Sequence, residues 1–184
     1  MRRLLVALAC AALVAGCGSS EPSRNAGPRP SAVRSALAGS PPALARLHAQ
    51  ANRLLGGGAS GFKSHLRALR GHPVVVNKWA SWCGPCRSEF PFFQRLSVRR
   101  GKRVAFLGVD ANDNDAAARR FLGQFPVTYP SYSDPDLKIS AVFNGVQAFP
   151  TTAFYDPNGG LSYVHQGAYA TERKLSEDID RYAR

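Results

Sequence analysis

The stretch Trp82-Cys83-Gly84-Pro85-Cys86 decides the fold of this chain, because it places two cysteines one helical turn apart directly after an apolar run. Residues 73–80, ahead of it, are mostly apolar and β-branched, which predicts a buried central strand. Residues 87–98, behind it, carry Phe90, Phe93 and Leu96 at helical spacing. A strand, a short turn and a Cys-X-X-Cys sequence that opens a helix together indicate a redox site rather than a structural disulfide.

The helix start determines which cysteine reacts. Unpaired N–H groups and the positive end of the helix dipole stabilise a thiolate at Cys83, which we predict to be the nucleophile. Cys86 lies one turn further in, close enough to form a disulfide with Cys83 and to resolve a mixed disulfide. We expect no metal, and no cofactor beyond this redox pair. The alternative is half of a zinc site, which normally takes four ligands and would draw on His48, His65, His72 or His165.

Two segments resemble one known family. Residues 77–91 look like the active site of the TlpA/ResA branch of thioredoxin-like proteins. Residues 149–156, followed by Gly159-Gly160, resemble its cis-proline strand and the turn after it. The resemblance covers residues 62–184. It implies an α/β thioredoxin fold, with a central mixed β-sheet flanked by helices on both faces and, in this chain, a helical N-terminal extension. The implied activity is that of a membrane-tethered, extracytoplasmic thiol–disulfide oxidoreductase.

The resemblance assigns roles to further residues. Pro150 is expected to be cis and to lie against the cysteine pair, where the backbone of Phe149 pairs with an extended substrate. A trans proline that starts a strand is the alternative. Gly84 and Pro85 are the pair found in thioredoxin, a reductant at about −270 mV, and they favour a reductase. Trp82 is expected to shield the nucleophile rather than to recognise substrate.

Glu89 follows Cys86 by three residues and therefore lies about one turn along the same helix. In the ResA-like branch an acid at the matching position is implicated in cysteine acidity, since a nearby carboxylate raises the pKa of a thiol and can relay its proton. A solvated helix glutamate is the alternative. Thioredoxins carry a buried aspartate where this chain has Asn77, which cannot titrate. Its neighbour Lys78 has no explanation in the sequence, because a central strand rarely buries a lysine.

The N-terminus resembles a bacterial lipoprotein signal. Two arginines precede an apolar stretch, residues 4–14, that is shorter than the ~20 residues needed to span a membrane. Val14-Ala15-Gly16-Cys17 resembles a lipobox, which implies cleavage before Cys17 and lipid attachment there. An ordinary secretory signal cut near Ala11, with Cys17 left free, is the alternative. We therefore divide the chain into a signal peptide (residues 1–16), a flexible tether (17–42) and a thioredoxin-like domain (43–184).

The chain is strongly basic, with a formal net charge of +12 that falls to +10 without residues 1–16. The basic residues are dispersed and no nucleic-acid recognition motif is present, so we expect no nucleic-acid partner. Attraction to an anionic membrane surface, helped by Arg24, Arg29 and Arg34, is one interpretation of this charge. A solvated basic surface without a function is the other.

Apolar spacing and turn residues predict the remaining elements. A helix over residues 43–55 ends at Gly56-Gly57-Gly58, where the family usually has a strand or hairpin. Asp113 or Asn114 caps one helix, Asn144-Gly145 closes another, and Thr171 caps the last. The other predicted elements are helices over residues 62–69, 116–125, 136–143 and 171–182, and strands over residues 103–109, 129–132 (an edge strand), 151–155 and 161–165.

Together these features predict an exported, lipid-anchored, monomeric thiol–disulfide oxidoreductase at the outer face of the bacterial cytoplasmic membrane. Its substrates are protein thiols and disulfides. The family implies a reductase that receives electrons from a membrane thiol donor and serves clients such as apocytochrome c or a copper-site protein. One alternative is a disulfide-forming oxidase or isomerase, with a potential nearer the about −120 mV of DsbA-type oxidants. Another is a non-catalytic module that binds a peptide or copper.

Overall fold

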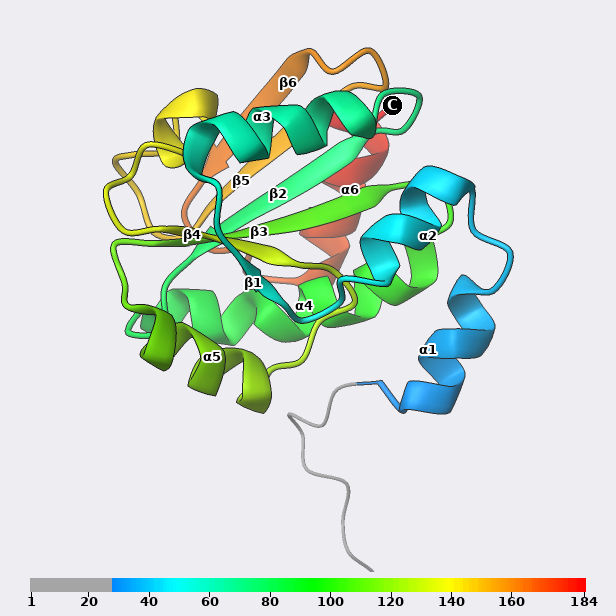
Figure 1. The fold of residues 1–184 in the computed structure, drawn as a ribbon, viewed down its shortest axis with the longest axis horizontal. Helices are drawn as coiled ribbons and strands as arrows, with labels where there is room; N and C mark the ends of the chain where they lie inside the picture. Colours follow the sequence, from blue (N-terminus) through cyan, green and yellow to red (C-terminus); the bar gives the residue numbers. More distant parts are fainter. Residues whose placement is uncertain (1–27) are drawn as a thin grey trace, which may run out of the picture.

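The computed structural model describes residues 28–184, so the predicted signal peptide and Cys17 lie outside the described residues. Six strands form one mixed sheet in the order β1-β4-β3-β2-β5-β6 (Figure 1). The strands are β1 (Leu54–Leu55), β2 (Val74–Trp79), β3 (Ala105–Ala111), β4 (Ser131–Asp134), β5 (Thr151–Tyr155) and β6 (Leu161–Gln166). The helices are α1 (Pro30–Leu37), α2 (Pro42–His48), α3 (Gly58–Ala68), α4 (Gly84–Arg100), α5 (Asp115–Gln124), α6 (Glu172–Tyr182) and the 3-10 helix η1 (Ser140–Phe143).

Strand β2 occupies the middle of the sheet, and every one of its residues is buried. A strand covered by helices on both sides is buried along its whole length and not only at alternate residues. It pairs in parallel with β3, where Val76 lies opposite Leu107, and antiparallel with β5, where Val76 lies opposite Ala153. The predicted strand over residues 73–80 is confirmed, and its C-terminal end leads through the Cys-X-X-Cys turn into helix α4.

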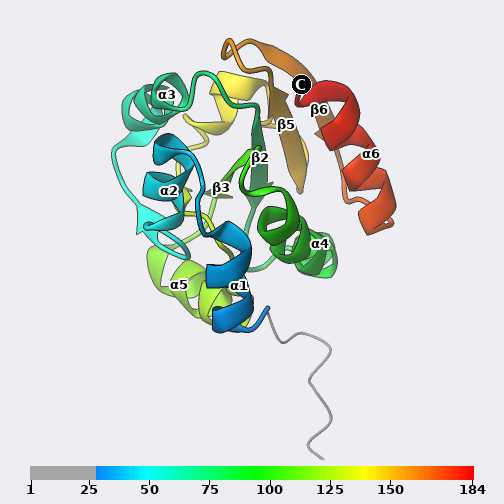
Figure 2. The same cartoon turned by 90° about the vertical axis from the view of Figure 1, so that its right-hand side faces the viewer.

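Helices cover both faces of the sheet, which confirms the predicted α/β architecture. In Figure 2, α2 and α3 lie on one side of the sheet and α4 and α6 on the other. Helices α4, α5 and α6 share a core with Val75 and Trp79, whereas α2, α3 and η1 share one with Val74 and Val76. Because successive side chains of a strand point to opposite faces, Asn77 faces α4 and the next residue, Lys78, faces α3 and η1.

The predicted helix over residues 43–55 is wrong in its second half. Helix α2 stops early, and the chain turns through Asn52, whose φ of 61° is left-handed. The Asn52 side chain holds this turn, because it donates to the Leu122 carbonyl and accepts from the Val127 N–H. Leu54–Leu55 then form β1, parallel to β4. The sheet therefore begins with a short edge strand and not with the expected all-helical entry.

The segment after α5 also departs from the prediction. Strand β4 is interior rather than an edge strand, since β1 pairs with its outer side. The expected helix over residues 136–143 shrinks to η1, because the Asp134 carboxylate accepts from the N–H groups of Ile139 and Ser140 and begins the helix there. Other local predictions are confirmed: the Asn114 side chain caps α5, Thr171 caps α6, and the left-handed Asn144 ends η1.

Residues 30–37, which we expected within a flexible tether, form helix α1. Pro30 favours helix initiation, and Leu37 packs against the end of α4. The fit is close, since a Cβ atom added at Gly101 would lie 2.7 Å from Leu37 Cδ2. Helix α1 therefore docks beside the C-terminal end of α4 (Figure 1). None of the helices in residues 28–184 combines the length and the apolar character that crossing a membrane requires.

Candidate active site

Cys83 lies where the sheet meets a helix N-terminus. Strand β2 ends at Trp79, and Cys83 is the N-cap residue of α4, with an extended backbone. Its Sγ atom accepts a hydrogen bond from the backbone N–H of Cys86 at 3.1 Å, in the way that N-cap side chains accept from the first helical turn. An N–H group directed at the sulfur, together with the dipole of a 17-residue helix, favours the thiolate over the thiol.

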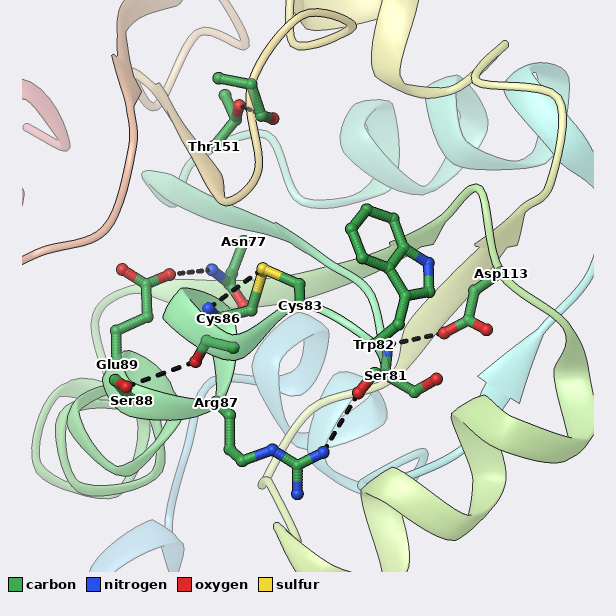
Figure 3. The surroundings of a disulfide bond; sticks show 12 residues. Asn77, Ser81, Trp82, Cys83, Cys86, Arg87, Ser88, Glu89, Asp113 and Thr151 are labelled. Atoms are coloured by element: carbon green, nitrogen blue, oxygen red, sulfur yellow. Dashed lines mark hydrogen bonds between the residues drawn. A yellow bond between two sulfur atoms is a disulfide. The ribbon is translucent and has the colours of Figure 1, made fainter.

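The two cysteines form a disulfide, with their Cα atoms 5.3 Å apart (Figure 3). Cys86 is fully buried, whereas Cys83 is 4% exposed. Gly84 and Pro85 form the exposed first turn of α4, and Pro85 gives up no hydrogen bond there, because the first N–H groups of a helix have no partner within it. An external thiol or disulfide therefore reaches Cys83 before Cys86.

Contacts from the end of β3 hold the turn that precedes Cys83. The Asp113 carboxylate accepts from the Ser81 N–H at 2.6 Å, and Arg87 donates to the Ser81 carbonyl at 3.2 Å. The indole N–H of Trp82 donates to the Asn112 carbonyl at 2.9 Å, although Trp82 is 56% exposed. Trp82 is therefore a fixed surface group beside Cys83.

The Phe149–Pro150 peptide bond is cis, which confirms the expected geometry. The Phe149 ring lies 4.9 Å from the ring of Trp82, measured between centroids, so the segment before β5 meets the turn before α4. In Figure 3, Thr151, the first residue of β5, lies across from the disulfide. The cis-proline segment and the Cys-X-X-Cys turn form one continuous site.

Glu89 is buried rather than solvated, on the opposite side of the disulfide from Trp82 (Figure 3). Its two carboxylate oxygens accept from Asn77 Nδ2 at 3.0 Å and from the Tyr169 N–H at 2.9 Å. Burial raises the pKa of Glu89 to about 7, although both hydrogen bonds lower it. Glu89 can therefore take up and release a proton near neutral pH, which Asn77 cannot do.

Lys78, for which the sequence offers no explanation, finds its partners on the other face of the sheet. Its ammonium group donates to the carbonyls of Gly145 and Val146 and lies 3.7 Å from the centroid of the Phe149 ring. Burial lowers the pKa of Lys78 to about 8, and attraction to Asp134 opposes that shift. The lysine therefore contacts the segment that leads into the cis-proline.

Two features of the site escape sequence reasoning. Tyr169 contributes a backbone N–H to Glu89 across a separation of 80 residues, and no side-chain pattern reveals such a group. Asp110, at the end of β3, is buried; this burial, and then the nearby carboxylate of Asp113, raise its pKa to about 8. The sequence offers one signal for Asp110, because an acidic residue stands at the end of a predicted apolar strand.

Two of the four histidines considered for a zinc site, His48 and His65, have other partners. The ring nitrogens of His48 lie within hydrogen-bonding distance of the Thr128 and Gly101 carbonyls, and His65 Nδ1 lies 3.1 Å from the Tyr132 hydroxyl. Across residues 28–184, no group of three His, Cys, Asp or Glu side chains is placed to hold a metal ion.

Comparison with known proteins decides the family. The profile described as Redoxin matches residues 49–179, which span the Cys-X-X-Cys turn and the cis-proline segment. The chain belongs to the Redoxin family. The Thioredoxin-like protein YneN of Bacillus subtilis is 32% identical over 124 residues, which cover 66% of this chain and 71% of that protein. Thiol-disulfide oxidoreductase ResA of Oceanobacillus iheyensis is 30% identical over 109 residues, which cover 59% of this chain and 56% of that protein.

A solved structure shows the same fold. The DsbF homologue from Corynebacterium diphtheriae has a TM-score of 0.58 and 30% sequence identity, over 63% of this chain and 75% of that chain. This Redoxin-family protein is therefore a thiol–disulfide oxidoreductase with a thioredoxin fold, of the TlpA/ResA type that residues 77–91 resemble. The chain spans little more than half the length of the ResA relative.

Glu89 gives the oxidised protein a pH-dependent stability. Its pKa is about 7 in the folded state, against 4.5 for an ordinary glutamate. Since the folded state then binds the proton more tightly than the unfolded chain, the contribution of Glu89 to the free energy of unfolding falls as the pH rises from about 4.5 to about 7. We expect Glu89→Gln to remove this slope, because glutamine stays neutral and a rotated Asn77 amide can pair with it through the unpartnered Oδ1.

Urea denaturation of the oxidised proteins at a series of pH values from about 4 to 8 measures the slope. The exposed Glu177→Gln is the matched control and should keep the wild-type profile. Parallel profiles for wild type and Glu89→Gln would show that Glu89 does not titrate in this range.

Proposed function

We propose that this protein is an exported, lipid-anchored reductase of protein disulfides at the outer face of the bacterial cytoplasmic membrane. The observation that carries the proposal is the placement of Cys83, whose sulfur caps α4 beside the exposed Trp82 and the cis-Pro150 segment. In this proposal Cys83 is the nucleophile and Cys86 the resolving thiol. The backbone of Phe149 and Pro150 binds the extended client chain.

The reaction starts from the reduced enzyme. The Cys83 thiolate attacks one sulfur of a client disulfide, so that a Cys83–client S–S bond forms, the client S–S bond breaks, and the departing client thiolate takes up a proton. The Cys86 thiolate then attacks the Cys83 sulfur and releases the second client thiolate. The client gains two electrons and the enzyme loses two, which leaves the Cys83–Cys86 disulfide seen in the structure. A membrane thiol donor returns two electrons for the next cycle.

Glu89 supports this cycle through proton transfer. Cys86 must lose a proton before it attacks, and Glu89 lies three residues further along α4 with a pKa of about 7. A group that titrates near the working pH is suited both to accept and to return a proton. Asn77 orients the carboxylate by its hydrogen bond and cannot compete for the proton.

The Gly84-Pro85 pair supports a reducing direction, since thioredoxin carries the same pair. We expect the Cys83–Cys86 couple to have a midpoint potential close to the about −270 mV of thioredoxin. Equilibration with glutathione or dithiothreitol buffers, read by the exposed Trp82 fluorescence, measures it. A potential near the about −120 mV of DsbA-type oxidants would instead support the oxidase alternative.

Trapping identifies the clients. We expect Cys86→Ser to accumulate a covalent adduct with its client, because Cys83 still attacks but nothing resolves the mixed disulfide. Non-reducing electrophoresis of cell-envelope extracts, followed by mass spectrometry, detects the adduct. Cys83→Ser is the matched control and should trap nothing. Equal trapping by the two variants would remove Cys83 as the nucleophile. The resemblance implies apocytochrome c or copper-site proteins among the clients.

The lipid anchor rests on the lipobox Val14-Ala15-Gly16-Cys17. We expect metabolic labelling with palmitate to mark the wild-type protein and Cys10→Ser, whose altered cysteine lies within the signal peptide, but not Cys17→Ser. Autoradiography of the immunoprecipitated proteins reads the result. Labelling of Cys17→Ser at the wild-type level would disprove attachment at this residue. Exposed arginines at the start of the described chain, Arg29 and Arg34, are placed to favour an anionic membrane surface.

A further inference from the structure

The Lys78 side chain is one of the largest fully buried side chains within residues 28–184. Its ammonium group has no part in the proposed sulfur chemistry. It projects from β2 to the face opposite Asn77 and Glu89, and it therefore does not approach the proton-transfer side of the site. Burying a cation away from water is costly unless it has close partners. Its partners therefore indicate what the residue is for.

Those partners all belong to one short segment, residues 145–149. The ammonium group donates to the Gly145 and Val146 carbonyls and stands over the ring of Phe149 at 3.7 Å. Within residues 28–184 it forms no ion pair with a carboxylate, and Asp134 attracts it only from further away. A cation that binds two carbonyl oxygens and an aromatic face restrains the backbone that carries these groups.

Apart from the Phe149 ring, which packs against Trp82 and against both cores, this segment has few other restraints. It connects η1 to β5 outside any regular element, and the Gly145 N–H donates to the Ser140 carbonyl at its start. At its end the Thr151 hydroxyl donates to the Ala148 carbonyl at 2.8 Å. Thr151 is the register partner of Lys78 in the β2–β5 pair. Lys78 of β2 and Thr151 of β5 lie opposite each other in the sheet, and the side chains of both therefore hold the segment.

Two aromatic rings connect Lys78 to the residue that precedes the nucleophile. Lys78 contacts Phe149, and the Phe149 ring contacts Trp82, which precedes Cys83. We propose that Lys78 is a positioning residue for substrate: it fixes residues 145–149, and with them the Phe149 backbone, in the conformation that a client chain pairs with beside Cys83. This inference rests on the proposed function, in which the cis-proline segment binds the client.

The chemistry separates this role from simple structural support. A methionine at position 78 has nearly the same length and carries no charge to bury, which offsets the cost of leaving the Gly145 and Val146 carbonyls without this donor. The same change removes both carbonyl contacts and the cation over Phe149. If Lys78 served only stability, Lys78→Met would lower the free energy of unfolding and leave the KM for a protein substrate unchanged.

The test compares Lys78→Met with wild type and with the exposed control Lys102→Met. We expect the KM for insulin, as a protein disulfide, to rise about tenfold in Lys78→Met, since the segment must be ordered anew by each client, while kcat stays within about twofold. The rate with dithiodipyridine, a small disulfide that needs no segment to bind it, should be unchanged. Amide hydrogen exchange over residues 145–149 should become faster, and the melting temperature should change little.

An unchanged KM together with unchanged exchange over residues 145–149 would overturn the inference. If Lys78→Met does not fold, Lys78→Gln, which keeps N–H donors without the charge, replaces it and should give a smaller rise in KM. A wild-type protein that does not reduce insulin at all would count against the proposed function. The exchange measurement would still report whether Lys78 holds the segment.

Discussion

The hydrogen bond from the Cys86 N–H to the Cys83 sulfur is the interaction on which the rest of the site depends. It requires α4 to begin at Gly84, directly behind the end of β2. The helix keeps that position because Phe90, Phe93 and Leu96 pack it into the core on one face of the sheet. Because Cys83 is the N-cap of α4, its sulfur moves with this helix start, and the packing of α4 fixes where the sulfur lies relative to the cis-proline segment.

Strand β2 supplies the two faces of the site with different chemistry. Asn77 meets Glu89 on one face, and Lys78 meets residues 145–149 on the other. Burial moves the two pKa values toward each other, to about 7 for the acid and about 8 for the base, because a poorly solvated site disfavours charge of either sign. In our proposals one face handles the proton, and the other holds the segment that binds the client chain.

Local patterns predict the parts of the site whose residues are close in the chain. The strand before Cys83, the helix after it and the caps at Asn114 and Thr171 depend on a few adjacent residues each, and the structure confirms them. The helix expected over residues 43–55 fails because Asn52 binds the Leu122 carbonyl, 70 residues away, and this contact overrides the apolar spacing. The Tyr169 N–H and the Gly145 carbonyl are backbone groups that every residue carries. Only the tertiary structure brings them to Glu89 and Lys78.

Helix α4 also separates the Cys83 sulfur from helix α1. Its 17 residues span about 25 Å, with the reactive sulfur at one end and α1 packed beside the other. Helix α1 therefore lies about the length of α4 away from the Cys83 sulfur. A large partner can approach the sulfur without meeting α1.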